Sequence, residues 1–304
     1  MKIYMKKCNE NTKRVAVGIC LAGALICAMM LLHYYVQQHR KEQQIEGMRE
    51  NYISAEALPT EEPVEAPVLE DATPQPTEEP SGVIIDGIEY PDFTGFEMPE
   101  KRIDFEGLQR DENEDIYAWI YIPNTNIDYP IVQHPDNPEY YLKRDLDGNS
   151  STAGCIFTQY YNAKDFNDNN TVIYGHNMKN KSMFRTLHNY EDAAFFEENP
   201  YVYIYTEYDT RIYQVFAEYE YSDKHIVLSY DFEDDDVFGE YLTEINNLSK
   251  AQYYNNYNWE IGVTQEDKII TLSTCIANRK EQRYLVQAKL IAVEAREDAV
   301  PDNE

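Results

Sequence analysis

The stretch from Lys268 to Leu290 constrains the fold and chemistry of this chain more than any other. It reads KIITLSTCIANRKEQRYLVQAKL, a β-strand pattern that ends at a cysteine and is followed, after a short polar loop, by a second strand. Strand side chains alternate between two faces, so Thr271 and Ser273 share a face with Cys275. Basic residues follow the thiol, a setting that favours the thiolate form. Cys275 is therefore a candidate nucleophile.

The alternative for Cys275 is a small buried hydrophobic residue, which is the common fate of a cysteine. Two other residues favour catalysis. The run TVIYGH over residues 171–176 is rich in β-forming residues and places His176 at a strand end. Arg283 opens the strand RYLVQAKL, and its positive charge can stabilise the oxyanion that forms when a thiolate attacks a carbonyl. Nucleophile, base and oxyanion partner are all available.

These segments resemble the sortase family. The motif TLSTC is followed eight residues later by arginine and is preceded, far upstream, by a strand that ends in Tyr-Gly-His-Asn-Met. The similarity extends from Ile116 to Leu290 through WIYIPNTNIDYPIVQ, EYYLKRD and GCIF. Serine at the variable position of TLxTC, a helical insertion before the catalytic strand and an N-terminal anchor resemble class B.

The resemblance implies a role for individual residues. The catalytic trio is His176, Cys275 and Arg283. Ser273 is expected to contact the sorting peptide, and Tyr141 and Leu142 are expected near the substrate groove.

The resemblance also implies the reaction. The thiolate attacks the Thr-Gly carbonyl of an NPxTG-like sorting signal on a secreted protein and forms a thioester. An amine of a cell-wall precursor or of a pilin lysine then resolves the thioester. The histidine acts as acid and then as base. No cofactor is required, and no metal-ligand spacing is present.

Two alternatives remain at this point. A hydrolytic cysteine peptidase would use water instead of an amine to resolve the thioester, and the sequence does not distinguish the two. A catalytically inert surface binding protein on a sortase scaffold is the other alternative. The intact histidine, cysteine and arginine argue against inertness.

An uncharged stretch from Val15 to Leu32 is long enough to cross ~30 Å of hydrocarbon as a helix. We expect a basic cytoplasmic tail over residues 1–14 and a transmembrane anchor over residues 15–36. Basic residues gather before the stretch, which puts the N-terminus in the cytoplasm and the rest outside, as in a Gram-positive bacterium. A cleaved signal peptide is the alternative, but the apolar run is longer than usual and lacks a clear cleavage site.

Residues 37–100 are dominated by Glu, Pro and Thr. Such a composition cannot form a core and stiffens the chain, so we expect an acidic, extended stalk. A proline-rich docking ligand is a weaker alternative. The chain has a formal net charge of −29 at pH 7. That charge excludes nucleic acid as a natural partner, because phosphates require clustered Lys and Arg.

A catalytic domain is expected over residues 101–297, followed by an acidic tail over 298–304. Its pattern predicts a helix over 101–114, many short strands, two short helices after His176 and an amphipathic helix spanning Val237 to Leu248. Strands without regular strand–helix alternation indicate a mostly β fold, a closed barrel with short peripheral helices. The barrel of sortases fits this pattern.

The remaining candidate sites have simpler interpretations. Cys155 in TAGCIF is interpreted as a buried strand residue, although a disulfide with Cys275 is conceivable outside the cell. The oxygen-rich segments DLDGNSS at 145–151 and DFNDNN at 165–170 do not meet the EF-hand pattern and are interpreted as turns. The other histidines lack ligand spacing and are assigned no role: His33, His39, His134, His188 and His225.

Overall fold

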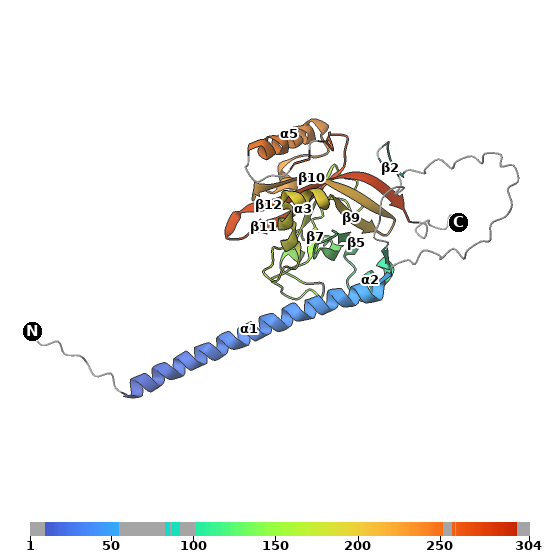
Figure 1. The fold of residues 1–304 in the computed structure, drawn as a ribbon. Coiled ribbons are helices and arrows are strands. Elements are labelled where there is room, and N and C mark those ends of the chain that lie inside the picture. The colour runs from blue at the N-terminus through green and yellow to red at the C-terminus, as the bar shows by residue number, and fades with distance from the viewer. Residues whose placement is uncertain are drawn as a thin grey trace, which may run out of the picture. The chain divides into compact units, whose positions relative to one another are not determined.

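The computed structural model describes residues 10–54, 83–85, 87–91, 101–251, 257–258 and 260–296. It divides into two compact units, Met1–Asn51 and Tyr52–Glu304. Figure 1 labels the main elements.

In the described residues, the first unit is formed by helix α1, Glu10–Tyr52, whose last residue already belongs to the second unit. Within the described residues, its Arg14–Tyr52 part is the one helix long and apolar enough to cross a membrane. The helix continues past residue 36, where the acidic stalk was expected to begin. Residues 37–50 are rich in Gln, Glu, Arg and Lys, which are good helix formers, and the first proline comes only at Pro59. The stalk prediction is therefore wrong for residues 37–52.

The other end of the expected stalk also has secondary structure. Strand β1, Ile53–Ser54, pairs with β4, Arg102–Ile103, and strands β2, Val83–Ile85, and β3, Ile88–Tyr90, form a hairpin. Tyr90 is buried, and Pro91 accepts a 3.1 Å hydrogen bond from the amide of Val293. The expected domain start at residue 101 leaves these strands out. The rest of the stalk, residues 55–82, 86 and 92–100, and the tail at 298–304 lie outside the described residues.

The second unit is a closed barrel of eight strands in the order β10-β12-β11-β8-β7-β6-β5-β9. This confirms the predicted fold class. The strands are β5 Ile116–Tyr121, β6 Asp128–Val132, β7 Ile156–Thr158, β8 Asn170–Tyr174, β9 Tyr201–Thr206, β10 Asp209–Ser222, β11 Ile269–Ile276 and β12 Arg279–Ala295.

The direction of three neighbouring strands decides where the chemistry lies. Strand β11 runs parallel to β8 and antiparallel to β12. Carboxyl ends of parallel neighbours meet at one edge of a sheet, so the residues after β8 and the last residues of β11 lie together. The antiparallel pairing brings the start of β12 to the same edge.

Short helices fill the connections, as the sequence predicts. They are α2 Phe105–Asp111, the 3₁₀ helices η1 Tyr140–Leu142 and η2 Phe184–Glu191, α3 Ala193–Glu198, α4 Ile226–Ser229 and α5 Asp235–Ala251. Side chains cap several of them. Asp104 accepts from the amide of Gly107 at α2, and Asp192 accepts from Ala194 at α3. Helix α2 is shorter than the helix predicted over 101–114, because it begins at Phe105 after the Asp104 cap and ends at Asp111.

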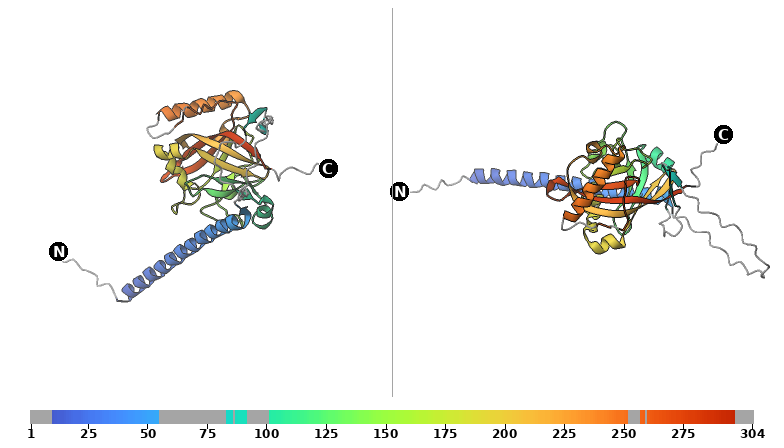
Figure 2. Two further views of the ribbon diagram at one scale, coloured as in Figure 1. Left: turned by 45° about the vertical axis from the view of Figure 1, so that its right-hand side comes forward. Right: turned by 90° about the horizontal axis from the view of Figure 1, so that it is seen from above.

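Helix α5 lies across the outside of the barrel next to β10 and β12 (Figures 1 and 2). Its apolar residues Phe238, Tyr241 and Ile245 pack in one cluster with Ile269 of β11 and Leu285 of β12. The cluster follows from the helical spacing in the sequence, which puts these side chains on one face. Helix α5 thus supports the strand that carries Cys275.

A tight turn joins β11 to β12. Ile276 pairs with Arg279, and Asn278 in the turn has a φ of 64°, a left-handed conformation that Asn tolerates. Strand β12 therefore begins at Arg279 and not at Arg283. The polar loop that the sequence indicates before RYLVQAKL is therefore shorter than expected, and Arg279, whose side chain is exposed, already belongs to the strand.

Candidate active site

Cys275 lies near the carboxyl end of β11 and is partly exposed. The neighbouring residues alternate as the strand pattern predicts. The hydroxyl of Thr271, on the same face as Cys275, accepts from Gln287, whose amide also donates to Tyr241 of α5. Cys275 therefore lies on the outer face of the sheet, beyond the part that α5 covers.

His176 follows β8 by two residues and lies at the same edge of the sheet as Cys275. Its Nε2 lies 2.7 Å from the carbonyl oxygen of Leu142, the last residue of η1. A carbonyl can only accept, so Nε2 carries a proton in this arrangement. The other ring nitrogen, Nδ1, is thereby left to exchange a proton with a substrate.

Arg283 is the direct cross-strand partner of Cys275 in β12. Its Nη1 donates to the carbonyl oxygens of Lys280 at 2.9 Å and Gln282 at 3.1 Å. Both bonds come from one nitrogen, and a guanidinium has five N–H donors in total. The side chain is thus oriented by its own strand and can also donate to a ligand.

These three residues line one cavity of about 160 Å³. Ser273 and Leu142 also line it, as the resemblance implied for the substrate groove. The other lining residues are Glu139, Phe157, Gln159, Tyr174, Gly175, Ser222, Asp223, Lys224, His225, Ile226 and Thr274. The structure therefore brings together five of the six residues that the sequence singled out.

The sixth residue, Tyr141, lies elsewhere. Its ring is buried, and its hydroxyl donates to Asp115 at 2.6 Å and to Asn113 at 3.1 Å. Burial raises the pKa of this hydroxyl, and the hydrogen bond to Asp115 raises it further. The Tyr141 side chain thus belongs to the packing beneath η1 and does not line the cavity, although its chain neighbour Leu142 does.

Burial also shapes the electrostatics of the cavity wall. It raises the pKa of the Tyr174 hydroxyl, and the charge of Arg283 opposes part of that rise. The pKa of His225 is lowered, first because of burial, while its own backbone and Glu139 act in the opposite direction. The cavity wall beside Arg283 therefore combines a neutral phenol and an imidazole that resists protonation with the charged side chains of Glu139, Asp223 and Lys224.

Three residues in or beside the cavity were missed in the sequence. Asn177 donates through Nδ2 to the carbonyl oxygen of Cys275 at 2.8 Å. His188, which was assigned no role, lies 3.4 Å from the same oxygen through Nε2, and its ring stacks on Tyr284. His225, also assigned no role, lines the cavity. The position of Asn177 directly after His176 was the available signal for it.

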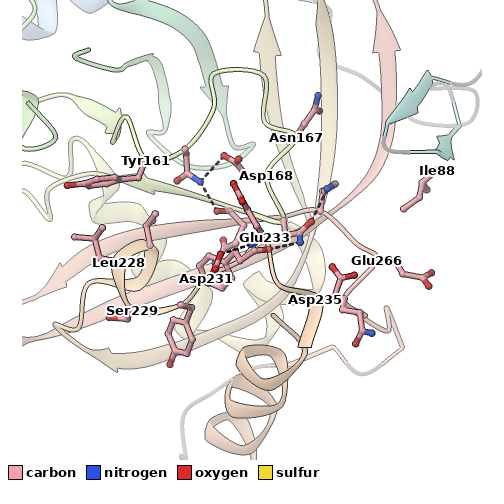
Figure 3. Close-up of a pocket in the computed structure, with 18 residues that line it drawn as sticks. Ile88, Tyr161, Asn167, Asp168, Leu228, Ser229, Asp231, Glu233, Asp235 and Glu266 are labelled. Atoms are coloured by element: carbon pink, nitrogen blue, oxygen red, sulfur yellow. Dashed lines mark hydrogen bonds between the residues drawn. The ribbon is translucent and has the colours of Figure 1, made fainter. Parts of the chain in front are cut away.

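A larger cavity of about 960 Å³ has a different lining (Figure 3). Figure 3 shows carboxylates from separate segments around it, among them Asp168, Asp235 and Glu266. In the described part of the chain, no group of three or more Asp, Glu, His or Cys is arranged to hold a metal ion. Asp168 instead accepts hydrogen bonds from Asn162 and from the amide of Ala163, which is turn chemistry. Cys275, His176 and Arg283 lie at the smaller cavity.

The fold and the smaller cavity define a closed β-barrel protein in which a thiol, an imidazole and a guanidinium share one site. The sortase domain model matches residues 120–291 of the chain. Sortase B of Listeria monocytogenes is 36% identical over 197 residues, which cover 63% of this chain and 76% of that protein. Sortase B of Staphylococcus aureus is 32% identical over 194 residues, with the same two coverages.

Solved structures agree with the sequence relatives. A Bacillus anthracis sortase B in complex with AAEK1 superposes with a TM-score of 0.59 at 26% identity, covering 85% of this chain and 99% of that one. A Staphylococcus aureus sortase B–substrate complex gives a TM-score of 0.54 at 31% identity and covers 62% and 84%. The chain belongs to the sortase family, as a class B member, and is a cysteine transpeptidase.

Proposed function

We propose that this transpeptidase cleaves the Thr-Gly bond of an NPxTG-like sorting signal with Cys275 as nucleophile, His176 as acid and base, and Arg283 as oxyanion partner. One observation carries the assignment. Cys275 and Arg283 come from the β11–β12 hairpin and His176 from the end of β8, far upstream in the sequence, yet the three side chains line one cavity of about 160 Å³ at a single edge of the sheet. The roles follow from what each group can do there.

In the first half-reaction, the Cys275 thiolate forms a bond to the threonine carbonyl carbon, and the carbonyl oxygen becomes an oxyanion. Arg283 stabilises that charge. The intermediate collapses to a thioester as the C–N bond breaks, and the departing glycine amine takes a proton from Nδ1 of His176. The Leu142 carbonyl accepts from Nε2 throughout, which supports the protonated ring before it donates.

In the second half-reaction, an acceptor amine attacks the thioester and gives a proton to Nδ1 of His176. The Cys275 thiolate leaves, so the enzyme returns to its starting state. Glu139 and Asp223 line the cavity and supply negative charge that attracts a cationic amine before it loses its proton. We propose an amine of a cell-wall precursor as acceptor, with a pilin lysine as the alternative.

The location of the enzyme is part of the proposal. Helix α1 anchors the chain in the cell membrane of a Gram-positive bacterium, with the basic residues before Val15 in the cytoplasm. The barrel then lies outside the membrane, where secreted proteins with sorting signals reach it.

Intact-mass measurement on the detergent-solubilised full chain tests the chemistry. With a panel of NPxTG-like peptides, the wild type is expected to gain the mass of the acyl fragment, and Cys275→Ala is expected to gain none while keeping the same circular dichroism spectrum. Cys155→Ala is the matched control, because Cys155 is buried and lies outside the cavity lining. An adduct on Cys275→Ala would remove Cys275 from its role.

The same assay with and without an added amine separates transfer from hydrolysis. A transpeptidase gives a peptide–amine conjugate when the amine is present. A product that remains the free acid at saturating amine would instead identify a hydrolytic peptidase.

A further inference from the structure

A side chain continues the hydrogen-bond ladder between β8 and β11 beyond the point where β8 ends. The last backbone bond of this parallel pair runs from the amide of Gly175 to the carbonyl of Ser273 at 3.1 Å. Parallel ladders advance two residues at a time, so the next bond would run from the amide of Asn177 to the carbonyl of Cys275. It is the Asn177 side chain that donates to that carbonyl, at 2.8 Å.

The Asn177 side chain takes the place of a backbone donor because the chain after β8 turns away from the sheet at this point. The carbonyl of His176 accepts from Phe184 at 2.9 Å, and Asn177 forms an isolated bridge with Met183. On its other side, β11 also loses regular pairing, since its register with β12 shifts between Cys275 and Ile276. The nucleophile thus occupies the last regular position of its strand, where a side-chain bond replaces a missing backbone bond.

Asn177 is itself held in place. Its Nδ2 lies 3.0 Å from Nε2 of His188, and Nδ1 of His188 lies 2.6 Å from the Glu191 carboxylate. The carboxylate requires a proton on Nδ1, so Nε2 accepts the second Asn177 hydrogen. Stacking at 4.4 Å on Tyr284, the neighbour of Arg283 in β12, fixes the imidazole plane.

We infer that Asn177 is a positioning residue, which ties the chain end that carries His176 to the strand end that carries Cys275, and that His188 and Glu191 orient its amide. The inference rests on the proposed roles of Cys275 and His176. Asn177 adjoins His176 in the chain and bonds the backbone of Cys275, so one side chain limits the separation of the thiol and the imidazole. Misplacement of a reacting group by about 1 Å can cost roughly 10²-fold in rate.

Steady-state peptide transfer by the full chain tests this role, with rates normalised to the folded fraction. Asn177→Ala and Asn177→Asp are both expected to lower kcat by at least about 10-fold while KM for the peptide stays within about 2-fold, the signature of lost positioning and not of lost binding. Asn177→Asp keeps the shape but replaces both donors by an acceptor. If it retains more than half of the wild-type kcat, the donor role is overturned.

Variants of His188 provide a second test, which does not depend on the folding of the Asn177 variants. His188→Gln retains an acceptor for Asn177 and is expected to stay closer to the wild-type kcat than His188→Ala, whereas equal losses would overturn the chain of contacts. Asn189→Ala, on the exposed part of the same 3₁₀ helix, is the matched control. If the wild type forms no acyl adduct on Cys275, the proposed function itself is contradicted. Normal kcat in the Asn177 variants would instead contradict only the positioning role of Asn177.

Discussion

Cys275 and Arg283 face each other as cross-strand partners in the β11–β12 hairpin. The second arginine in this hairpin, Arg279, is paired with Ile276, and its guanidinium forms a two-pronged ion pair with Glu220 of β10. The two arginines therefore have different tasks. Arg283 lines the cavity that also holds Cys275 and His176, whereas Arg279 neutralises a carboxylate on the surface of the sheet.

Replacing the two arginines is expected to separate these tasks. Arg283→Ala should lower the turnover of a sorting peptide by ~10²-fold or more, the scale for losing one oxyanion donor. Arg279→Ala should cost far less, because it removes an exposed ion pair. Arg283→Lys should recover part of the activity, since it keeps the charge but not the planar fork.

Peptide cleavage rates for the three variants, measured under identical conditions, check this prediction. A loss in Arg279→Ala that exceeds the loss in Arg283→Ala would contradict the assignment. Unchanged turnover in Arg283→Ala would show that another group stabilises the oxyanion.

His225 is expected to make the stability of the barrel depend on pH. Its folded-state pKa is lowered from the ordinary value of 6.5, mainly by burial. Above pH 6.5 both states are neutral at this group. As the pH falls through 6.5, the unfolded chain takes up the proton first, so the free energy of unfolding decreases until the lower folded-state pKa is passed.

His225→Asn removes this titration and keeps an acceptor at the start of α4, where Nδ1 of His225 accepts from the amide of Leu228. The fall in melting temperature between pH 7.5 and pH 5.5 should therefore be smaller in the variant than in the wild type. An equal or larger fall in the variant would show that burial of His225 does not contribute.

The sequence predicts the features that depend on local alternation and spacing. The strand that carries Cys275 and the helix with Phe238 and Tyr241 on one face both form as expected. Each is set by side chains a few residues apart, whose pattern decides which face is buried. Strand β12 begins at Arg279, before the expected start at Arg283. Its first residues are exposed and charged, so they show no alternation of apolar and polar side chains from which the strand could be predicted.

Long-range contacts explain what the sequence does not reveal. Tyr141 was expected near the substrate groove, but its hydroxyl donates to Asp115, 26 residues upstream, and its ring is buried outside the cavity lining. His188 has no recognisable spacing, yet its Nε2 lies 3.4 Å from the carbonyl oxygen of Cys275, 87 residues away in the chain. Such partners become neighbours only when the barrel closes.

Gly175, which precedes His176, is expected to tolerate no side chain. A Cβ atom at this position would lie 2.6 Å from Cδ1 of Ile156 and 2.6 Å from Cγ of Phe184. Both neighbours are buried, so one of them must move, at a typical cost of about 1–3 kcal/mol for overpacking. Because His176 is adjacent, Gly175→Ala should also lower kcat.

Thermal unfolding and peptide turnover of Gly175→Ala check both effects. The matched control is Gly87→Ala in the β2–β3 turn, where a Cβ meets no atom within 4 Å but the positive φ of 82° adds backbone strain. The control should lose some stability and keep kcat. A Gly175→Ala enzyme with wild-type kcat would show that His176 is held independently of this contact.

The β2–β3 hairpin is expected to belong to the catalytic domain, so the position of an N-terminal truncation decides the stability of what remains. A chain that begins at Ser81 keeps the hairpin and should be soluble, folded and active on peptides. A chain that begins at Lys101 loses buried Ile85 and Tyr90, which are 6% and 5% exposed. Their burial stabilises the fold by about 3 kcal/mol, so the shorter chain should melt roughly 5–10 °C lower.

Substitutions within the Ser81 chain distinguish side-chain burial from chain length. Tyr90→Ala should account for much of the lost stability, whereas Ile84→Ser should have little effect because Ile84 is 70% exposed. Equal melting temperatures for the two truncated chains would place the hairpin outside the domain. Aggregation or inactivity of the Ser81 chain would instead mean that residues before Ser81 are needed, and one such contribution is the pairing of Ile53 with Ile103 between β1 and β4.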